Sequence, residues 1–311
     1  MAGAFDLAAA QTFLTRQNLD GWLLEDFHHN NPILWQIVGE RRHTTRRVFL
    51  FIPPTGTPRL LLHMIDAERL SDLGWPIIQY QSRESQDRRL GELLQGKPRV
   101  AMEYSKDCAL PVVSRVDAGT IEQVRSHGVE VVSSGDVLQF AVARWSPEQL
   151  RSHKVAAEAV VAVANEAFAF IGTNLDRGVT ELTVRDFIVD QFGARDLTVD
   201  GGPDVAVNAH ASDPHYEPTP ATAPRIQYGD WVLIDLWAKE KAPGAVYGDS
   251  TWVAQVGREV PAERQQVFEV VRQARDTAIE LLETSWRQGR SLEGWQVDQA
   301  ARAVVDAAGY G

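Results

Sequence analysis

The chain has a single cysteine, no long apolar run and no excess of basic residues. Because Cys108 is alone, no internal disulfide can form, and nothing around it indicates an activated thiol. The longest apolar run, Val48 to Pro54, is too short to span a bilayer. Met1 to Asp6 lacks the basic start and long apolar core of a signal peptide. We therefore expect a cytoplasmic protein that does not enter a membrane.

Several catalytic motifs are missing as well. The sequence contains no HExxH, no Walker motif and no GxSxG, so it gives no support to a zincin, a P-loop protein or an α/β-hydrolase. The net charge of −11 repels phosphate backbones, which makes nucleic acid a poor partner. What remains is an ordinary globular composition, 44% apolar and 23% charged, in 311 residues that suggest two domains.

Over residues 1–145, short apolar runs alternate with helical segments, which predicts an α/β domain built on a mixed sheet. Pro53-Pro-Thr-Gly56 separates two of these runs as a turn. We expect helices at residues 7–17 and 32–38, and strands at residues 21–25, 47–52, 59–63, 76–80, 99–104 and 129–132.

A second domain, residues 146–311, is predicted to begin with a long helix. Ser146 and Gln149 form a capping box, with Pro147 at the first helical position. We expect this helix to end near Gly172 and to bury one apolar stripe. The stripe consists of Leu150, Ala157, Val160, Val161, Ala164, Phe168 and Ile171.

The remainder of the second domain reads as a helix at 180–192, two strands at 231–238 and 246–256, and two final helices. Pro243-Gly244 supplies the turn between the strands. Pro261 and Ser291 open the last two helices. This order fits a duplicated unit whose second copy lacks its strands, or a domain that two helices simply close. The pattern alone leaves both possibilities open.

Asp235 and Asp249 are the most informative residues, because each lies within one of the two predicted strands. If the hairpin turns near residue 242, they face each other with Cβ atoms about 4.5–5.5 Å apart. Two carboxylates that close repel each other, and a shared proton or a bound cation relieves the repulsion. The alternative is a hairpin that projects into water. Apolar neighbours on both faces of residues 232–237 favour burial instead.

A polar loop before the hairpin contains two histidines, His210 and His215. Neutral imidazole binds metals and transfers protons near pH 7. Most loop histidines are nonetheless ordinary surface residues, so the loop by itself does not establish a site.

Together these segments resemble a known family. Ser212-Asp-Pro-His-Tyr216, Arg225-Ile-Gln-Tyr-Gly-Asp-Trp-Val-Leu-Ile-Asp235 and Tyr247-Gly-Asp-Ser-Thr251 are similar to motifs of the metallopeptidases that include aminopeptidase P, prolidase and methionine aminopeptidase. Val297-Asp-Gln-Ala-Ala-Arg302 through Gly311 resembles what precedes that family's next metal motif. Residues 1–145 resemble the creatinase-type N-terminal domain only in length and element order.

The resemblance implies an α+β "pita-bread" catalytic domain of two related halves and an enzyme that cleaves Xaa-Pro peptide bonds. It implies two divalent metal ions, with manganese expected and cobalt, zinc or iron as alternatives. By position, Asp235 matches the bidentate ligand of one metal and Asp249 the carboxylate that bridges both. His215 matches the histidine that contacts substrate and assists proton transfer, and His210 has no clear counterpart. The family's N-terminal domains often build subunit contacts, so we expect a homodimer that binds peptide substrates.

The sequence departs from the family pattern at several positions. Gly248 stands where alanine is common and Trp252 where arginine is common, and neither change removes a ligand. The family's remaining ligands, a histidine and two glutamates, follow the Gly-Tyr-Gly segment at which this sequence stops. We therefore expect only the first half of the pita-bread domain plus two helices of the second, and no activity from residues 1–311 alone. A non-catalytic binding protein on the same fold and a creatinase-like hydrolase that needs no metal are the alternatives.

Overall fold

The computed structural model describes residues 5–213 and 216–311. Contacts divide the chain into two units, residues 1–157 with 239–248 and residues 158–238 with 249–311. The division falls inside helix α6 (Pro147–Asn174). Sequence patterning places the domain boundary slightly earlier, at the cap of this helix.

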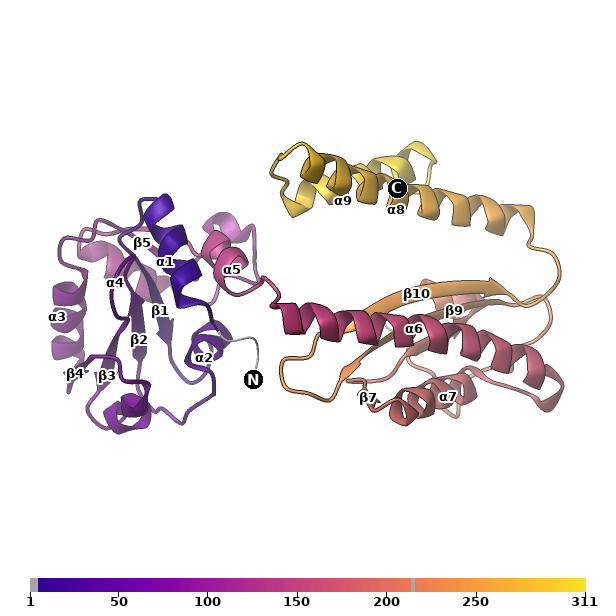
Figure 1. The fold of residues 1–311 in the computed structure, drawn as a ribbon, viewed down its shortest axis with the longest axis horizontal. Helices are drawn as coiled ribbons and strands as arrows, with labels where there is room; N and C mark the ends of the chain where they lie inside the picture. The colour runs from indigo at the N-terminus through magenta and orange to yellow at the C-terminus, as the bar shows by residue number, and fades with distance from the viewer. Residues whose placement is uncertain (1–4, 214–215) are drawn as a thin grey trace. The chain divides into compact units, whose positions relative to one another are not determined.

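The first unit is built on a six-stranded mixed sheet in the order β4-β3-β2-β1-β5-β6 (Figure 1). The antiparallel pairs are β1–β2 and β2–β3, whereas β3–β4, β1–β5 and β5–β6 run parallel. This is the mixed α/β sheet that the alternating apolar runs predict. The strands are β1 (Gly21–Asp26), β2 (Val48–Ile52), β3 (Arg59–His63), β4 (Ile77–Tyr80), β5 (Arg99–Met102) and β6 (Glu130–Ser133).

Helices cover both faces of this sheet, so its central strands are apolar on both sides. Along β2, Leu50 and Ile52 enter one hydrophobic core, while Phe49 and Phe51 enter the other. Burial on both faces explains why these strands read as continuous apolar runs rather than alternating ones. The first core includes side chains of α1 (Leu7–Arg16), α2 (Pro32–Val38) and α5 (Gly135–Ala141), and the second includes those of α3 (Arg83–Leu94) and α4 (Ala118–Ser126).

A fully buried carboxylate, Glu103, lies just after β5. It accepts hydrogen bonds from Trp22 Nε1 at 2.6 Å, from Asn31 Nδ2 at 2.8 Å and from Ser134 Oγ at 3.1 Å. Burial outweighs these three donors and raises the pKa of Glu103 to about 7. The network joins β1, the start of α2 and the start of α5 through one ionisable group.

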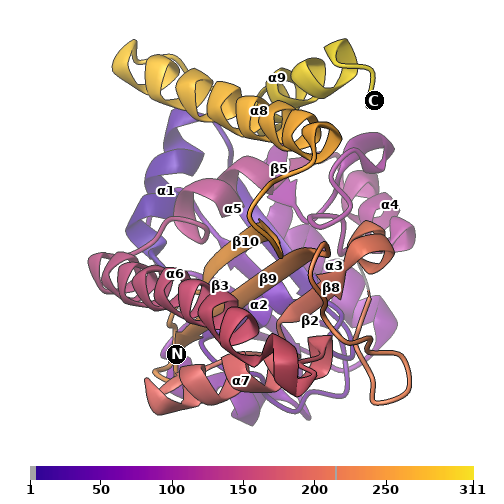
Figure 2. The same ribbon diagram turned by 90° about the vertical axis from the view of Figure 1, so that its right-hand side faces the viewer.

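The second unit packs α6 and α7 (Glu181–Ala194) against one face of a four-stranded sheet (Figure 2). In β9 (Trp231–Glu240), Val232, Ile234, Leu236 and Ala238 are fully buried in this core. The other strands are β7 (Leu197–Thr198), β8 (Asp204–Val207) and β10 (Gly248–Gln255), in the order β10-β9-β7 with β8 also pairing with β9. Sequence patterning predicts β9 and β10 but treats the region of β7 and β8 as irregular.

Helix α6 begins as predicted, with Ser146 and Gln149 exchanging the two hydrogen bonds of a capping box. Two details differ. The helix passes Gly172 and ends at Asn174, because an exposed glycine in a helix costs only about 1 kcal/mol. The buried stripe is also displaced around the helix, which leaves Leu150 and Val161 exposed. The buried residues follow the i, i+3, i+4 spacing as Ala156, Val160, Val163, Ala164, Ala167 and Ile171.

By length and composition alone, the helical segment Pro147–Arg177 could cross a membrane. Its inner side chains form the core of the second unit, as in the central helix of a globular domain.

The last two helices, α8 (Ala262–Arg287) and α9 (Gly294–Ala307), pack against each other. Helix α9 begins later than predicted, because its N-cap is Glu293 rather than Ser291, and Glu293 and Gln296 form its capping box. The shorter 3₁₀ segments are Ala67–Leu73, Lys106–Cys108, Leu175–Arg177 and Asn208–Ser212.

The Glu103 network generates a prediction about pH. Between the ordinary pKa of 4.5 and the folded value of about 7, the folded state keeps a proton that the unfolded state releases. The free energy of unfolding therefore falls as pH rises through this window, by as much as about 3 kcal/mol for this one group. Urea unfolding measured at pH 4.5–8 should show this decline in the wild type. Glu103→Gln cannot titrate and should flatten the decline, and equal slopes in both proteins would contradict the account.

Candidate metal centre

Asp235 and Asp249 lie on neighbouring strands of the second unit, Asp235 on β9 and Asp249 on β10. Successive side chains of a strand point to opposite faces of the sheet, and this alternation shows which face each aspartate lies on. Asp235 lies between the buried residues Ile234 and Leu236, so it faces away from the core. Thr251 is two residues after Asp249 on the same face of β10, and its Oγ1 donates a 2.7 Å hydrogen bond to Asp235 Oδ1. The two carboxylates therefore share one face of the sheet.

The electrostatics of the pair agree with this placement. Partial burial and, after it, the negative charge of Asp235 raise the pKa of Asp249. The prediction that both acids point inward is wrong, however, because Asp235 is half-buried and Asp249 is exposed. The apolar residues that share the face of Asp235, such as Leu233 and Trp237, are themselves only half-buried. Apolar neighbours on both sides of a strand thus do not require two equally buried faces.

A third carboxylate belongs to the same row. Asp204 of β8 is the register partner of Asp235 in the antiparallel β8–β9 pair. Directly paired residues point to the same side of a sheet, so Asp204, Asp235 and Asp249 come from three strands and face one way. Sequence reasoning misses Asp204 because β8 is only four residues long and follows Gly201-Gly-Pro203. The pairing register is the signal that identifies it.

Gly248 places Asp249 by letting β10 approach α6. A Cβ atom on Gly248 would lie 2.4 Å from the backbone nitrogen of Ala157, closer than real Cβ contacts allow. Glycine therefore stands at this position because the helix backbone occupies the space of a methyl group. Trp252, the second departure from the family pattern, packs against the core of the second unit.

A buried glutamate holds the loop that precedes the hairpin. Glu181, the first residue of α7, is fully buried and accepts hydrogen bonds from Val207 N at 2.7 Å and Tyr216 Oη at 2.6 Å. His210 Nδ1 lies 3.0 Å from the same carboxylate, and the His210 ring stacks on Tyr216 with centroids 4.0 Å apart. His210 thus contacts two residues that hold the loop, Glu181 and Tyr216. Burial and the hydrogen bond to Glu181 raise the pKa of Tyr216.

Sequence reasoning misses Glu181, because an acidic residue in the first turn of a helix is ordinarily an exposed partner of the helix dipole. Only the contacts with β8 and the loop reveal its position. His215, the predicted proton-transfer residue, lies outside the described residues.

The donor chemistry of this face fits part of a divalent metal site. Carboxylate oxygens are the ligands that hard cations prefer, and a cation would relieve the repulsion between Asp235 and Asp249. Within residues 5–213 and 216–311, no group of three histidine, cysteine, aspartate or glutamate side chains is close enough to hold a metal ion. The pair therefore fits two ligands of a metal centre rather than a complete one.

Comparison with known families agrees with these motifs. The model of metallopeptidase family M24 matches residues 151–311, about half of the chain.

The chain belongs to metallopeptidase family M24.

Solved structures show the same fold over nearly the whole chain. The dipeptidase PepE of Mycobacterium ulcerans is 24% identical, with 99% of this chain and 79% of that chain covered and a TM-score of 0.66. A dipeptidase from Pyrococcus horikoshii OT3 is 20% identical over 98% and 78% of the two chains, with a TM-score of 0.55. A prolidase from the same organism is 18% identical over 98% and 78%, with a TM-score of 0.53. Comparison with curated protein sequences gives no match.

Membership of the M24 family confirms the resemblance seen in the sequence and the mixed α/β, pita-bread type of fold. It places the chain in a class of metal-dependent peptidases, for which two acidic ligands on neighbouring strands are an appropriate donor set.

The close approach at Gly248 generates a prediction about stability. Gly248→Ala forces β10 away from α6 and should lower the free energy of unfolding by roughly 1–3 kcal/mol, the usual cost of overpacking. Gly172→Ala is the matched control, because Gly172 lies within α6 with nothing within 4 Å of its added Cβ. Alanine should stabilise that position by about 0.5–1 kcal/mol. Urea unfolding of both variants measures the difference, and a stabilised Gly248→Ala protein would contradict the close packing.

Proposed function

We propose that this M24 chain is a metal-dependent aminopeptidase or dipeptidase that cleaves Xaa-Pro peptide bonds. The carrying observation is the placement of Asp235 and Asp249 on one face of β9 and β10, with Thr251 fixing one oxygen of Asp235. Prolidase and Xaa-Pro dipeptidase are the names of solved proteins that share the fold at 17–18% identity. Together with the resemblance of the motifs, those names support proline specificity as part of the proposal.

Asp235 and Asp249 are the residues that would hold a dinuclear metal centre, in the roles that the family resemblance implies for them. Manganese is the proposed metal, with cobalt, zinc or iron as alternatives. When bound, such ions activate water and polarise the scissile carbonyl. Two carboxylates offer at most four oxygens, so a dinuclear centre needs further ligands.

The chain's own residues prepare the site before any metal binds. Thr251 donates to one oxygen of Asp235 and so restricts its orientation. Glu181 anchors the segment that contains His210 and Tyr216, next along the chain to the proposed proton-transfer residue His215. An unperturbed histidine has a pKa of about 6.5, which suits proton transfer near neutral pH. We also propose that the protein works in the cytoplasm as a homodimer, which light scattering at micromolar concentration would test.

Hydrolysis of short peptides tests the proposed function. The protein expressed from its complete gene, supplied with manganese, should hydrolyse Ala-Pro or Ala-Pro-Ala faster than the same peptides with alanine in place of proline. Asp249→Asn keeps the shape of the side chain but removes the bridging charge, so it should lower kcat/KM by more than about 100-fold. If the gene encodes a longer chain, residues 1–311 alone should be inactive, because the described residues provide too few ligands.

A second variant separates metal binding from proton transfer. His215→Ala should lower turnover while manganese content stays nearly unchanged, whereas Asp249→Asn should lose both. Loss of manganese from His215→Ala would make His215 a ligand instead. Manganese-independent hydrolysis would favour a creatinase-like reaction, and a protein that binds Xaa-Pro peptides without cleaving them would favour a binding function.

A further inference from the structure

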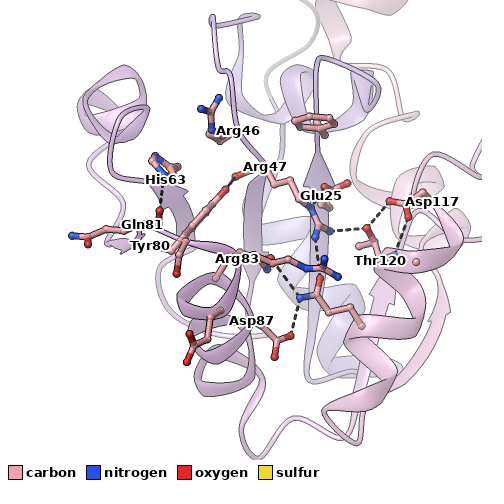
Figure 3. Close-up of a pocket in the computed structure, with 16 residues that line it drawn as sticks. Glu25, Arg46, Arg47, His63, Tyr80, Gln81, Arg83, Asp87, Asp117 and Thr120 are labelled. Carbon is pink, nitrogen blue, oxygen red and sulfur yellow. Dashed lines mark hydrogen bonds and ion pairs between the residues drawn. The ribbon is translucent and has the colours of Figure 1, made fainter.

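The first unit contains a cavity of about 1030 Å³ that the proposed peptidase function does not use. It is lined only by residues between Glu25 and Gln123, so it belongs wholly to the first unit (Figure 3). Its size is at the upper end of the range for small-molecule sites, which is about 300–1000 Å³. The first turns of α3 and α4 both reach its wall.

Most of the charged groups in the wall already have partners. Arg47 pairs with Glu25 at 2.7 Å and donates to Thr120 Oγ1 and Gln123 Oε1. Asp117 caps α4 by accepting from Thr120. These interactions hold the side chains at the floor of the cavity in place. The charges of Glu25, Arg47 and Asp117 are therefore already compensated within the protein and are not free to bind a ligand.

Two adjacent residues of opposite charge remain. Arg83 and Glu84, the first two residues of α3, are exposed and line the cavity. Across residues 5–213 and 216–311, neither side chain makes a hydrogen bond or an ion pair within 4 Å, and the charge of Arg83 acts on Asp87 only from a longer distance, as a minor cause of the lowered pKa of that carboxyl. In the view of Figure 3 the Arg83 guanidinium extends across the cavity in the direction of Thr120.

A buried amide provides an additional donor. The Gln86 side chain lines the cavity and is 3% exposed, and its Nε2 has no hydrogen-bond partner in the described part of the chain. An unpaired buried donor costs roughly 1–3 kcal/mol, so its presence beside a cavity indicates a partner that arrives from outside the fold.

The charge balance of the wall restricts the class of ligand. Arg46, Arg47 and Arg83 are the cationic residues, and the carboxylates are Glu25, Glu84, Asp87 and Asp117. A nearly neutral wall of this kind has no excess of positive charge to attract polyanions such as nucleotides, yet it offers both signs of charge at Arg83 and Glu84. Phe27, 43% exposed, and Tyr80 add aromatic surface.

We propose that this cavity binds a small zwitterion with an apolar side chain, an amino acid or dipeptide. Its carboxylate pairs with Arg83 and accepts from the Gln86 amide, its ammonium group pairs with Glu84, and its side chain contacts Phe27. Guanidinium and carboxylate groups match as planar, bidentate partners, so Arg83 can hold the carboxylate of such a ligand through two hydrogen bonds.

Calorimetric titration with L-phenylalanine tests the site. Phenylalanine should bind, whereas 3-phenylpropanoate, which lacks the ammonium group, and phenethylamine, which lacks the carboxylate, should each bind at least tenfold more weakly. Arg83→Gln should lower the affinity for phenylalanine at least tenfold. Arg88→Gln, which changes an exposed residue of the same helix, should leave the affinity unchanged. Failure of phenylalanine to bind, equal binding of all three compounds, or wild-type affinity in Arg83→Gln would overturn the proposal.

Gln86→Leu distinguishes a binding role from a structural one. The nitrogen of the Gln86 amide is unpaired and its oxygen accepts only a long hydrogen bond from Gln123 Nε2, at 3.5 Å. Removing this amide should therefore raise the melting temperature while weakening the binding of phenylalanine. A lowered melting temperature would show that the amide serves the fold, and unchanged affinity would show that it does not contact the ligand. Either result would overturn the assignment of Gln86.

Discussion

The alternation of side chains along β9 is the constraint on which the second unit depends. Four alternate residues, Val232, Ile234, Leu236 and Ala238, enter the core shared with α6 and α7. A shift of one residue in strand register would expose all four and bury Asp235. The hydrophobic core therefore selects the face on which the acidic residues lie. Gly248 adds a second restraint, because β10 meets the backbone of α6 without room for a methyl group.

The acidic face carries an electrostatic cost that the fold alone does not remove. Asp249 has a raised pKa next to Asp235, and Thr251 donates a hydrogen bond to one oxygen of Asp235. Asp204 extends the row onto a third strand. By contrast, the buried carboxylate of Glu181 is satisfied by the donors of the neighbouring loop. The second unit thus contains both an acidic residue used for structure, Glu181, and a carboxylate pair that a cation would stabilise.

Much of this fold could be predicted from the sequence, because its signals are local. Continuous apolar runs identify β2 and β3, and the capping box at Ser146 identifies the start of α6. Errors occur where two local signals compete or where tertiary contacts decide. Ser291 is a typical N-cap residue, whereas the structure caps α9 with Glu293, which is not. Strand β8 is too short to show a periodic pattern, and it is recognised only through its pairing with β9.

The residues of the candidate site also fall into those that the sequence identifies and those that only the structure reveals. Asp235 and Asp249 are conspicuous as charges inside apolar strands, whereas Asp204 and Glu181 acquire their positions only from register and packing. The direction of Asp235 could not be derived from its neighbours, because half-buried apolar residues occur on the open face of β9 as well as in the core.

The most direct test of the account is anomalous diffraction from crystals grown with manganese. The account predicts an anomalous peak between the carboxylates of Asp235 and Asp249, with metal–oxygen distances of about 2.0–2.3 Å typical of a divalent cation on carboxylate ligands. It also predicts that this peak is absent from crystals of Asp249→Asn. Crystals at the same manganese concentration with no peak at these residues, and with both carboxylates bonded only to protein groups, would contradict the assignment of this face as a metal centre.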